Sequence, residues 1–408
     1  MAGMKILFLS DNFPPEVNAP ASRTYEHAKR WVEAGASVTV ITCAPNFPRG
    51  IVHSGYENRW RSTETVDGIK VVRVKTFISG NEGFATRIFD YLSFMVSAVF
   101  FGLFEPRPSV VVGTSPQFFA ACGAWLLSIL KWRPFVFELR DLWPASIVTV
   151  GAMRSGIAIR LLEALELFLY RRAQLIVSVT ESFVDDLEYR GIPREKMVVV
   201  RNGVDRERFK PCEKSSATAE RYDVADRFVV SYLGTHGMAH ALGNVLDAAS
   251  LLKDELGVVF LLVGDGAEKA VIQRRVESEN LENVVLHDSV PKAEMPALWS
   301  VTNAALVHLK DDPVFSTVIP SKIFEAFGMG KPIIIAQPDG EAAEIVRSAG
   351  AGEWIAPEDP AALAAIVKRW AQDSDLVSSY AGNAAAAAND HDRSRLADIL
   401  LQHLNRCA

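Results

Sequence analysis

The chain of 408 residues lacks the features that mark several large classes of protein. Its four cysteines show no Cys-x-x-Cys spacing, which argues against a disulfide framework or a zinc site and favours reduced thiols. Its longest apolar run, residues 91–104, is shorter than the roughly eighteen residues that span a bilayer. The apolar run near the N-terminus is too short for the core of a signal peptide. We therefore expect a globular protein of the cytoplasm.

Basic residues are not in surplus, because 43 Lys and Arg are outnumbered by 49 Asp and Glu, which argues against a general nucleic-acid binder. In neither half of the chain is the first strand followed by Gly-x-Gly-x-x-Gly and an acidic residue about twenty positions later, which argues against a nicotinamide dehydrogenase. The sequence offers no Ser-His-Asp order and no cluster of metal ligands. We therefore expect no metal and no cofactor.

Short apolar, β-branched runs alternate with helix-length segments along the whole chain, in two series. The first series is KILFLS, SVTVIT, IKVVRV, SVVVGT, PFVFEL, LIVSVT and MVVVRN, and the second is RFVVSYLG, GVVFLLVG, NVVLHD, AALVHL, KPIIIA and GEWIA. Strands separated by helices predict parallel, doubly wound sheets. Because the chain is too long for one hydrophobic core, the two series predict two Rossmann-like α/β domains.

The polar stretch 201–227 separates the two series and contains the turn signal Asn202-Gly203. We therefore expect a first domain over residues 1–205 and a second over 206–380. The helical segment 381–408 has no further strand to feed, so it must pack on existing surface, for example back on the first domain. Ligands bind outside the carboxyl ends of strands in such sheets, so a central cleft that both domains face is the expected site.

Two glycine-bearing turns follow strands of the second domain. Gly234 and Gly237 lie in one turn, and Gly264 and Asp265 lie in the other. Such turns let the backbone approach a ligand, and a following helix N-terminus favours a phosphate. An ordinary strand-to-helix turn, with Asp265 as a helix cap in the second case, explains each of them equally well.

The segment PSKIFEAFGMGKPIIIA, residues 320–336, reads as a turn, a short helix and a strand. Lys322 would lie in the first helical turn, where the dipole disfavours a cation, and a bound anion would remove that conflict. Glu325 would lie on the same face as Ser321 and Lys322, with a carboxylate able to accept two ribose hydroxyl groups. The alternative is a surface ion pair between Lys322 and Glu325. Together with the glycine turns, the segment predicts a nucleotide-sugar site.

In the first domain, Glu138, Arg140 and Asp141 follow an apolar strand, where the same crevice rule expects function. The alternative is that Asp141 caps the next helix and that Arg140 pairs with Glu138.

The whole chain resembles the GT-B glycosyltransferases of family 4. Within them it is similar to the subgroup that builds bacterial polysaccharides, including the WbuB-like N-acetyl-L-fucosaminyl transferases and the WcaI-like colanic-acid enzymes. The stretches that carry the resemblance include FPPEVNAPASRTYEHAKRW, FELRDLWPAS, LEALELFLYRRAQLIVSVTES, NGVDRERFKP, YLGTHGMAHAL, LLVGDG and PSKIFEAFGMGKPII. The resemblance implies an acceptor-binding first domain and a second domain that binds the nucleotide-sugar.

The resemblance also assigns residues, and the chain departs from the family at several of them. The family's second motif glutamate, which binds the ribose, falls on Glu325, whereas its first falls on Thr317. The family's Arg and Lys for the diphosphate fall on Thr235 and His240, so Lys322 becomes the compensating cation. The sequence Asn-Ala-Pro-Ala at 18–21 replaces the usual Gly-Gly loop, and Arg140 replaces the histidine of many relatives.

These assignments give three sets of predicted site residues. Catalytic roles fall on Asp141, Arg140 and Lys322; donor contacts on Glu325, Ser321, Thr317, Gly234, Thr235, His236, Gly237, Gly264 and Asp265; and acceptor contacts on Asn18, Arg23 and Glu138. The resemblance implies retention of anomeric configuration by front-face attack, with the leaving diphosphate accepting the acceptor's proton. No protein nucleophile is then required, so catalysis would rest on positioning and charge stabilisation.

The resemblance further implies two substrates, a nucleotide-sugar, taken to be UDP-linked, and a polyprenyl-diphosphate-linked glycan of O-antigen or capsule type. The apolar segment 84–108, with Arg87 and Arg107 near its ends, fits a helix at the cytoplasmic face of the inner membrane, and a buried core helix explains it too. Two other functions remain open at this stage: a UDP-sugar 2-epimerase of the same architecture, and a non-catalytic nucleotide-sugar-binding protein.

Overall fold

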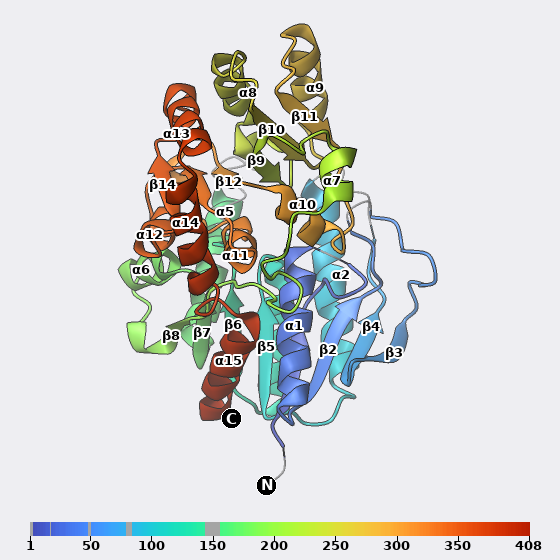
Figure 1. The fold of residues 1–408 in the computed structure, drawn as a ribbon. Coiled ribbons are helices and arrows are strands. Elements are labelled where there is room, and N and C mark those ends of the chain that lie inside the picture. Colours follow the sequence, from blue (N-terminus) through green and yellow to red (C-terminus); the bar gives the residue numbers. More distant parts are fainter. Residues whose placement is uncertain (1–2, 17, 48–49, 79–83, 143–155) are drawn as a thin grey trace. The chain divides into compact units, whose positions relative to one another are not determined.

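The computed structural model describes residues 3–16, 18–47, 50–78, 84–142 and 156–408, apart from a few side chains near residues 85 and 158, and it divides into two compact units (Figure 1). Unit 1 consists of Met1–Arg201 and Arg393–Ala408, and unit 2 consists of Asn202–Asp392. The chain thus passes from the first unit to the second within the polar stretch 201–227 and returns to the first unit at Arg393.

The described part of unit 1 contains an eight-stranded sheet in the order β3-β4-β2-β1-β5-β6-β7-β8. Its strands are β1 (Lys5–Leu9), β2 (Ser37–Cys43), β3 (Arg61–Val66), β4 (Ile69–Val74), β5 (Val110–Thr114), β6 (Phe135–Leu139), β7 (Leu175–Ser178) and β8 (Met197–Val199). All pairs are parallel except β3 with β4. The seven parallel strands coincide with the seven predicted runs. Strand β3 was not predicted, because this edge strand, Arg-Ser-Thr-Glu-Thr-Val, has few apolar residues and alternates between exposed and half-buried positions.

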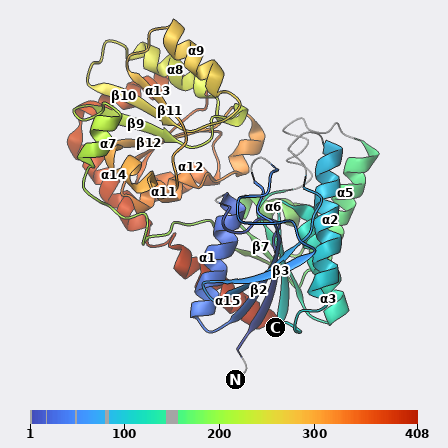
Figure 2. The same cartoon turned by 90° about the vertical axis from the view of Figure 1, so that its right-hand side faces the viewer.

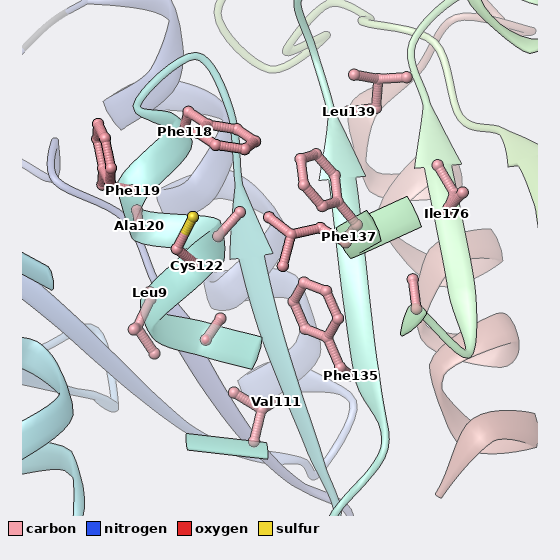
Figure 3. Packing of buried hydrophobic residues seen from close by; sticks show 14 of the residues in the cluster. Leu9, Val111, Phe118, Phe119, Ala120, Cys122, Phe135, Phe137, Leu139 and Ile176 are labelled. Atoms are coloured by element: carbon pink, nitrogen blue, oxygen red, sulfur yellow. The ribbon is translucent and has the colours of Figure 1, made fainter. Parts of the chain in front are cut away.

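Helices cover both faces of this sheet (Figure 2). The helices of unit 1 are α1 (Ala19–Glu33), α2 (Phe84–Gly102), α3 (Phe118–Lys131), α5 (Ile157–Arg172), α6 (Glu181–Tyr189), the short η1 (Arg194–Lys196) and α15 (Arg393–Cys407). Helices α2, α3, α5 and α6 share one apolar core with the sheet, in which aromatic residues of α3 and β6, such as Phe118 and Phe137, pack together (Figure 3). Helices α1 and α15 share the core on the other face.

The last helix, α15, packs along α1. Leu396, Leu400 and Leu404, spaced four residues apart, form one buried stripe of this helix. The Arg30 guanidinium donates two hydrogen bonds, of 2.8 and 2.7 Å, to the carboxylate of Asp398. The C-terminal segment therefore belongs to the core of unit 1, although unit 2 lies between the two parts of that unit in the sequence.

Unit 2 contains a six-stranded parallel sheet in the order β11-β10-β9-β12-β13-β14. Its strands are β9 (Phe228–Leu233), β10 (Val258–Val263), β11 (Val284–His287), β12 (Ala304–His308), β13 (Ile333–Ala336) and β14 (Gly352–Ile355), all within the second predicted series. Its helices are α7 (Ser216–Arg221), η2 (Met238–His240), α8 (Leu242–Leu251), α9 (Lys269–Ser278), α10 (Met295–Val301), η3 (Pro313–Thr317), α11 (Lys322–Gly328), α12 (Glu341–Ser348), α13 (Pro360–Gln372) and α14 (Ser374–Ala387). Because the strands are parallel, the loops after β9, β10, β12 and β13 leave the same edge of the sheet.

The described residues contain neither a membrane-spanning helix nor a cluster of metal ligands. None of the helices there is long and apolar enough to cross a bilayer. No group of three or more His, Cys, Asp and Glu side chains is arranged to hold a metal ion in the same residues.

Candidate functional site

The two glycine-bearing loops of unit 2 are in direct contact. A Cβ on residue 264 would lie 1.7 Å from the carbonyl oxygen of Gly234, and a Cβ on residue 266 would lie 2.4 Å from that of His236. The backbone N–H of His236 donates to the carbonyl of Asp265 at 2.9 Å. Glycine at 264 and 266 is therefore required by the approach of the two loops, which fixes their geometry at the carboxyl edge of the sheet.

Lys322 lies against the first of these loops. Its Nζ is 3.5 Å from the centroid of the Tyr232 ring, and a Cβ on residue 234 would lie 2.6 Å from its Cε. The absence of a side chain at Gly234, where φ is +142°, thus leaves room for the lysine. Burial lowers the pKa of Lys322 to about 7, although Glu325 acts in the opposite direction. The structure therefore places a lysine whose pKa is lowered by burial beside the glycine turn.

Two histidines, His236 and His240, lie near the ring of Tyr232, and a third, His308, lies beside His240. His236 and His240 have ring centroids 6.0 and 5.7 Å from that of Tyr232. His236 is fully buried, and both of its ring nitrogens lack a hydrogen-bond partner among the described residues. The ring of His308 interacts through Nδ1 with the carbonyl of His240 at 2.8 Å and through Nε2 with the amide nitrogen of Asn244 at 3.0 Å.

Glu325 lies one turn into α11 and is half-buried. Its Oε2 accepts a hydrogen bond of 3.2 Å from the indole N–H of Trp299 on α10. This contact orients the carboxylate, and an ionised carboxylate has about four lone-pair sites in all. The alternative of an exposed Lys322–Glu325 surface pair does not describe Lys322, which packs on Tyr232.

The other predicted donor residues lie on the same loops. Ser321 is exposed at the start of α11, and its side chain makes no capping hydrogen bond. Thr317 ends η3, with its hydroxyl donating to the carbonyl of Val314 at 2.9 Å. Thr235 is exposed, and its carbonyl accepts a hydrogen bond from the Tyr232 hydroxyl. Asp265 is exposed as well and accepts from the N–H of Gly266, a local turn contact.

In unit 1, two of the predicted acceptor residues form a buried ion pair. The Arg23 Nε donates to Glu138 Oε1 at 2.8 Å, and the Arg23 Nη atoms donate to the carbonyls of Val200 and Arg201. Asn18, the third, caps α1 by accepting from the N–H of Ala21 at 2.9 Å. Asn18 and Arg23 thus have roles within the fold of unit 1, and their contacts with an acceptor stay a prediction. The pairing predicted as an alternative, Arg140 with Glu138, is also replaced by the Arg23 pair.

Arg140 and Asp141 lie at the carboxyl end of β6, where they were predicted. Both backbone N–H groups donate to the hydroxyl of Ser115, which follows β5, at 2.8 and 3.2 Å. Burial lowers the pKa of Arg140 to about 10, and its Nε and Nη1 have no partner among the described residues. The helix that Asp141 was alternatively expected to cap would begin within residues 143–155, which lie outside the described part of the chain.

A group of carboxyl and amide side chains at the same edge was not predicted from the sequence. Asp11 is the second residue after β1, Glu16 lies in the same loop, and Gln117 lies in the loop after β5. The atoms Asp11 Oδ1, Glu16 Oε2 and Gln117 Oε1 have no partner among the described residues. Burial, assisted by Asp90 and Glu16, raises the pKa of Asp11 to about 8. The crevice rule that selected Asp141 would have selected Asp11 too, because each follows the end of a parallel strand.

Two domain models match the chain. The glycosyl transferase 4-like domain matches residues 18–203, and the domain of glycosyl transferases group 1 matches residues 222–387. The two matches fall in unit 1 and unit 2, except for the last two residues of the first match.

Whole-chain relatives agree with these models. The Escherichia coli K12 protein WcaI, by name a glycosyl transferase of colanic acid biosynthesis, is 26% identical over 377 residues, which are 90% of this chain and 92% of the relative. The crystal structure of Anabaena HepE in complex with UDP and glucose has a TM-score of 0.73 at 20% identity and covers 98% of this chain and 99% of its own. The sucrose-phosphate synthase of Thermosynechococcus elongatus has a TM-score of 0.75 at 15% identity, with 99% and 98% covered. These structures establish the GT-B fold.

Proposed function

The chain belongs to the glycosyltransferases that these two domain models describe, and we propose that it transfers a sugar from a UDP-sugar to a lipid-linked glycan in bacterial surface polysaccharide synthesis. The name of WcaI supports a role in polysaccharide synthesis, and the UDP-bound HepE structure supports UDP as the nucleotide of the donor. The observation that carries the donor assignment is the arrangement of Lys322 and Glu325 on one short helix, beside two glycine loops in contact.

In this proposal unit 2 binds the nucleotide-sugar. Glu325 accepts hydrogen bonds from the ribose hydroxyls, and Lys322 faces the diphosphate with the backbone N–H groups of the Gly234–Gly237 turn. Thr317 and Ser321 precede Glu325 in the segment between β12 and β13 and contact the sugar or the phosphate.

The proposed reaction retains the anomeric configuration. The acceptor hydroxyl oxygen forms a bond to the anomeric carbon, the bond from that carbon to the diphosphate breaks, and the departing phosphate oxygen takes the hydroxyl proton. Lys322 stabilises the negative charge that develops on the diphosphate as it leaves. Electrostatic stabilisation has its largest effect on such charge in the transition state. No metal and no cofactor take part in this scheme.

Unit 1 holds the acceptor in this proposal, through the strand-end side chains that include Arg140 and Asp141. Asp11 joins them, because a carboxyl group that is protonated at neutral pH can both donate to and accept from a sugar hydroxyl. Glu16 and Gln117 add acceptor oxygens for further hydroxyls.

We expect Asp11→Ala to raise the KM for a polyprenyl-diphosphate-linked monosaccharide about tenfold, the loss of one hydrogen bond in a buried site, and to leave UDP affinity unchanged. Asp11→Asn should restore most of the loss, because an amide also donates and accepts. Steady-state kinetics and UDP calorimetry on the same preparations measure both effects. An unchanged acceptor KM in Asp11→Ala, or a matching loss of UDP affinity, would contradict the assignment.

We further propose that one surface of unit 1 contacts the membrane that carries the acceptor. Helices α2 and α3 pack together, and apolar side chains are exposed along α2, on the loop after it and at the end of α3: Phe89, Val96, Phe100, Leu103, Phe104, Ile129, Leu130 and Trp132. Arg107 joins the two segments by donating to the carbonyls of Lys131 and Trp132. An exposed apolar patch with aromatic residues and a cation at its border suits the interface of an anionic membrane. The side chain of Arg87, predicted for the same surface, lies outside the described residues.

The double substitution Phe104→Glu/Trp132→Glu should reduce co-sedimentation with anionic phospholipid vesicles about tenfold or more. These side chains are 68% and 83% exposed, and the substitution removes the free energy gained when they are buried in the membrane. Leu256→Glu, at a position in unit 2 that is 89% exposed, is the matched control and should bind vesicles like the original chain. Equal co-sedimentation of all three proteins would show that this surface does not contact the membrane.

The proposed function is tested by a thermal-shift screen against UDP-, GDP- and dTDP-sugars, followed by turnover with a polyprenyl-linked monosaccharide. Stabilisation by a UDP-sugar and sugar transfer are expected. Stabilisation without transfer to any lipid-linked acceptor would favour a binding protein, and conversion of the UDP-sugar without acceptor would favour an epimerase.

A further inference from the structure

Burial lowers the pKa of the three histidines and of Lys322 at the proposed diphosphate site, which reduces its positive charge at neutral pH. His236, His240 and Lys322 lie beside Tyr232 at the edge of the unit 2 sheet, and His308 contacts the carbonyl of His240. Lys269, the other lysine near His236, donates to the carbonyl of Gly264 and pairs with Asp288. A diphosphate is strongly anionic, so its proposed site needs an additional positive charge when the ligand binds.

His236 is the first indication of a ligand. Its side chain is fully buried, and both ring nitrogens lack a hydrogen-bond partner among the described residues. A neutral imidazole carries one N–H donor and one acceptor, and burying them unpaired is unfavourable. A polar group that binds beside the glycine loops would satisfy this side chain.

Lys322 is the second indication. It lies on the face of the Tyr232 ring, which favours its charged form, while burial disfavours that form and lowers its pKa to about 7. Glu325, on its own helix, is the acidic group that acts on it. The lysine is therefore close to its titration midpoint at neutral pH, where a small change in its surroundings changes its charge.

The charged and titratable groups around the cluster come from every neighbouring element. His236 faces Lys269 of α9, Lys322 of α11 and Asp265 of the loop after β10. His240 faces Lys322, His308 and His236, and His308 of β12 faces Lys322 and is bonded to the carbonyl of His240. Burial is the main cause that lowers the pKa of each histidine to about 4, so all three are neutral at pH 7.

We propose that this cluster binds the diphosphate of the donor by taking up a proton, so that Lys322 carries a full charge only when the site is occupied and the His236 ring donates a hydrogen bond to the ligand. The proposal rests on the proposed function, since it assigns the diphosphate to this edge. An anionic oxygen about 4 Å from a partly buried amine, at an effective dielectric constant of about 20, raises the pKa of that amine by about three. This increase is sufficient to keep Lys322 fully charged at pH 8 in the complex.

The sign of the pH effect follows from this coupling. Above pH 7 the free site loses the Lys322 proton, and binding must recover it, so the Kd for UDP should rise about tenfold for each pH unit between 8 and 9. The terminal phosphate of UDP, with a pKa of about 6, is already ionised in this range and contributes no proton.

The test is titration calorimetry of the whole chain with UDP at pH 8, in HEPES and in Tris, whose ionisation enthalpies differ. We expect an uptake of about 0.9 proton for each UDP bound. Lys322→Gln should abolish the uptake and weaken binding at pH 7 about tenfold or more, whereas His236→Leu should weaken binding but retain the uptake. His236→Gln, which keeps an N–H donor, should bind more tightly than His236→Leu.

Lys331→Gln is the matched control, because burial also lowers the pKa of Lys331. This lysine precedes β13 and therefore lies at the amino ends of the strands, away from the proposed site at their carboxyl ends. This variant should take up the same proton as the original chain. UDP binding without proton uptake, or with an uptake that persists in Lys322→Gln, would overturn the proposal and leave the proposed function standing. If UDP, GDP and dTDP all fail to bind, the donor assignment and this proposal are both wrong.

Discussion

Replacing Glu325 by alanine is expected to weaken UDP binding at least about a hundredfold while leaving the fold intact. Two hydrogen bonds from ribose hydroxyls to a carboxylate contribute about 1.5 kcal/mol or more each, which together exceed the 2.8 kcal/mol that corresponds to about a hundredfold change in affinity. The substitution removes only a half-buried side chain near the start of α11, so the sheet behind it is not disturbed. Calorimetry with UDP at pH 7 measures the effect.

Two variants separate this effect from simple loss of packing. Glu325→Gln keeps an oxygen for the Trp299 indole but loses the charge, so its affinity should lie between those of the original chain and Glu325→Ala. Glu353→Ala is the matched control in the same unit, because Glu353 also accepts an indole hydrogen bond, from Trp370 at 3.0 Å. Unchanged UDP affinity in Glu325→Ala, or an equal loss in Glu353→Ala, would remove the ribose role from Glu325.

The second large effect is expected in unit 1, where Arg23→Met should destabilise the fold by about 3–5 kcal/mol. Arg23 and Glu138 form an ion pair whose side chains are 5% and 2% exposed, so the substitution leaves a carboxylate in the core without its main partner. The guanidinium also holds the carbonyls of Val200 and Arg201 near the end of the first part of the unit. Hydrogen exchange followed by mass spectrometry should show faster exchange in the strands of unit 1 and unchanged exchange in unit 2.

The double variant Arg23→Met/Glu138→Met identifies the cause, because it removes both charges and should recover much of the lost stability. The pH dependence gives a further check. Burial alone would raise the pKa of Glu138, but Arg23, Arg140 and His27 hold it at about 2. Because this value is below that of the unfolded chain, the stabilisation is present above about pH 4.5 and is lost as the pH falls toward 2. A double variant as unstable as Arg23→Met would indicate that the arginine acts through its carbonyl contacts alone.

Most strands of both sheets could be predicted from the sequence, because buried parallel strands are nearly continuous apolar runs. All thirteen predicted runs contain a strand of the structure. Strand β3 was missed because an exposed edge strand needs little apolar surface, so its polar residues give no such signal.

The residues of the candidate site could be predicted from the sequence only in part. The sequence shows which residues follow a strand, but it does not show which partner a side chain contacts. The positions of Lys322 and Glu325 on one short helix, and of Gly234 and Gly264 on turns, were predicted correctly. That Arg23 reaches Glu138 across 115 residues, and that Lys322 packs on Tyr232, depends on tertiary packing that no local pattern encodes. Tyr232 and Asp11 were missed for related reasons, since one lies inside a strand and the other resembles an ordinary loop residue.

We propose that unit 2 binds a nucleotide-sugar through Glu325 and Lys322 and that the chain transfers its sugar. The most direct measurement is a radiolabel transfer assay with a UDP-sugar and a polyprenyl-diphosphate-linked monosaccharide, run for the original chain, Glu325→Ala and Glu353→Ala. We expect labelled lipid-linked product with the original chain and with Glu353→Ala, and at least about a hundredfold less with Glu325→Ala at donor concentrations below its KM. Equal product formation by Glu325→Ala and the original chain would show that Glu325 does not hold the donor.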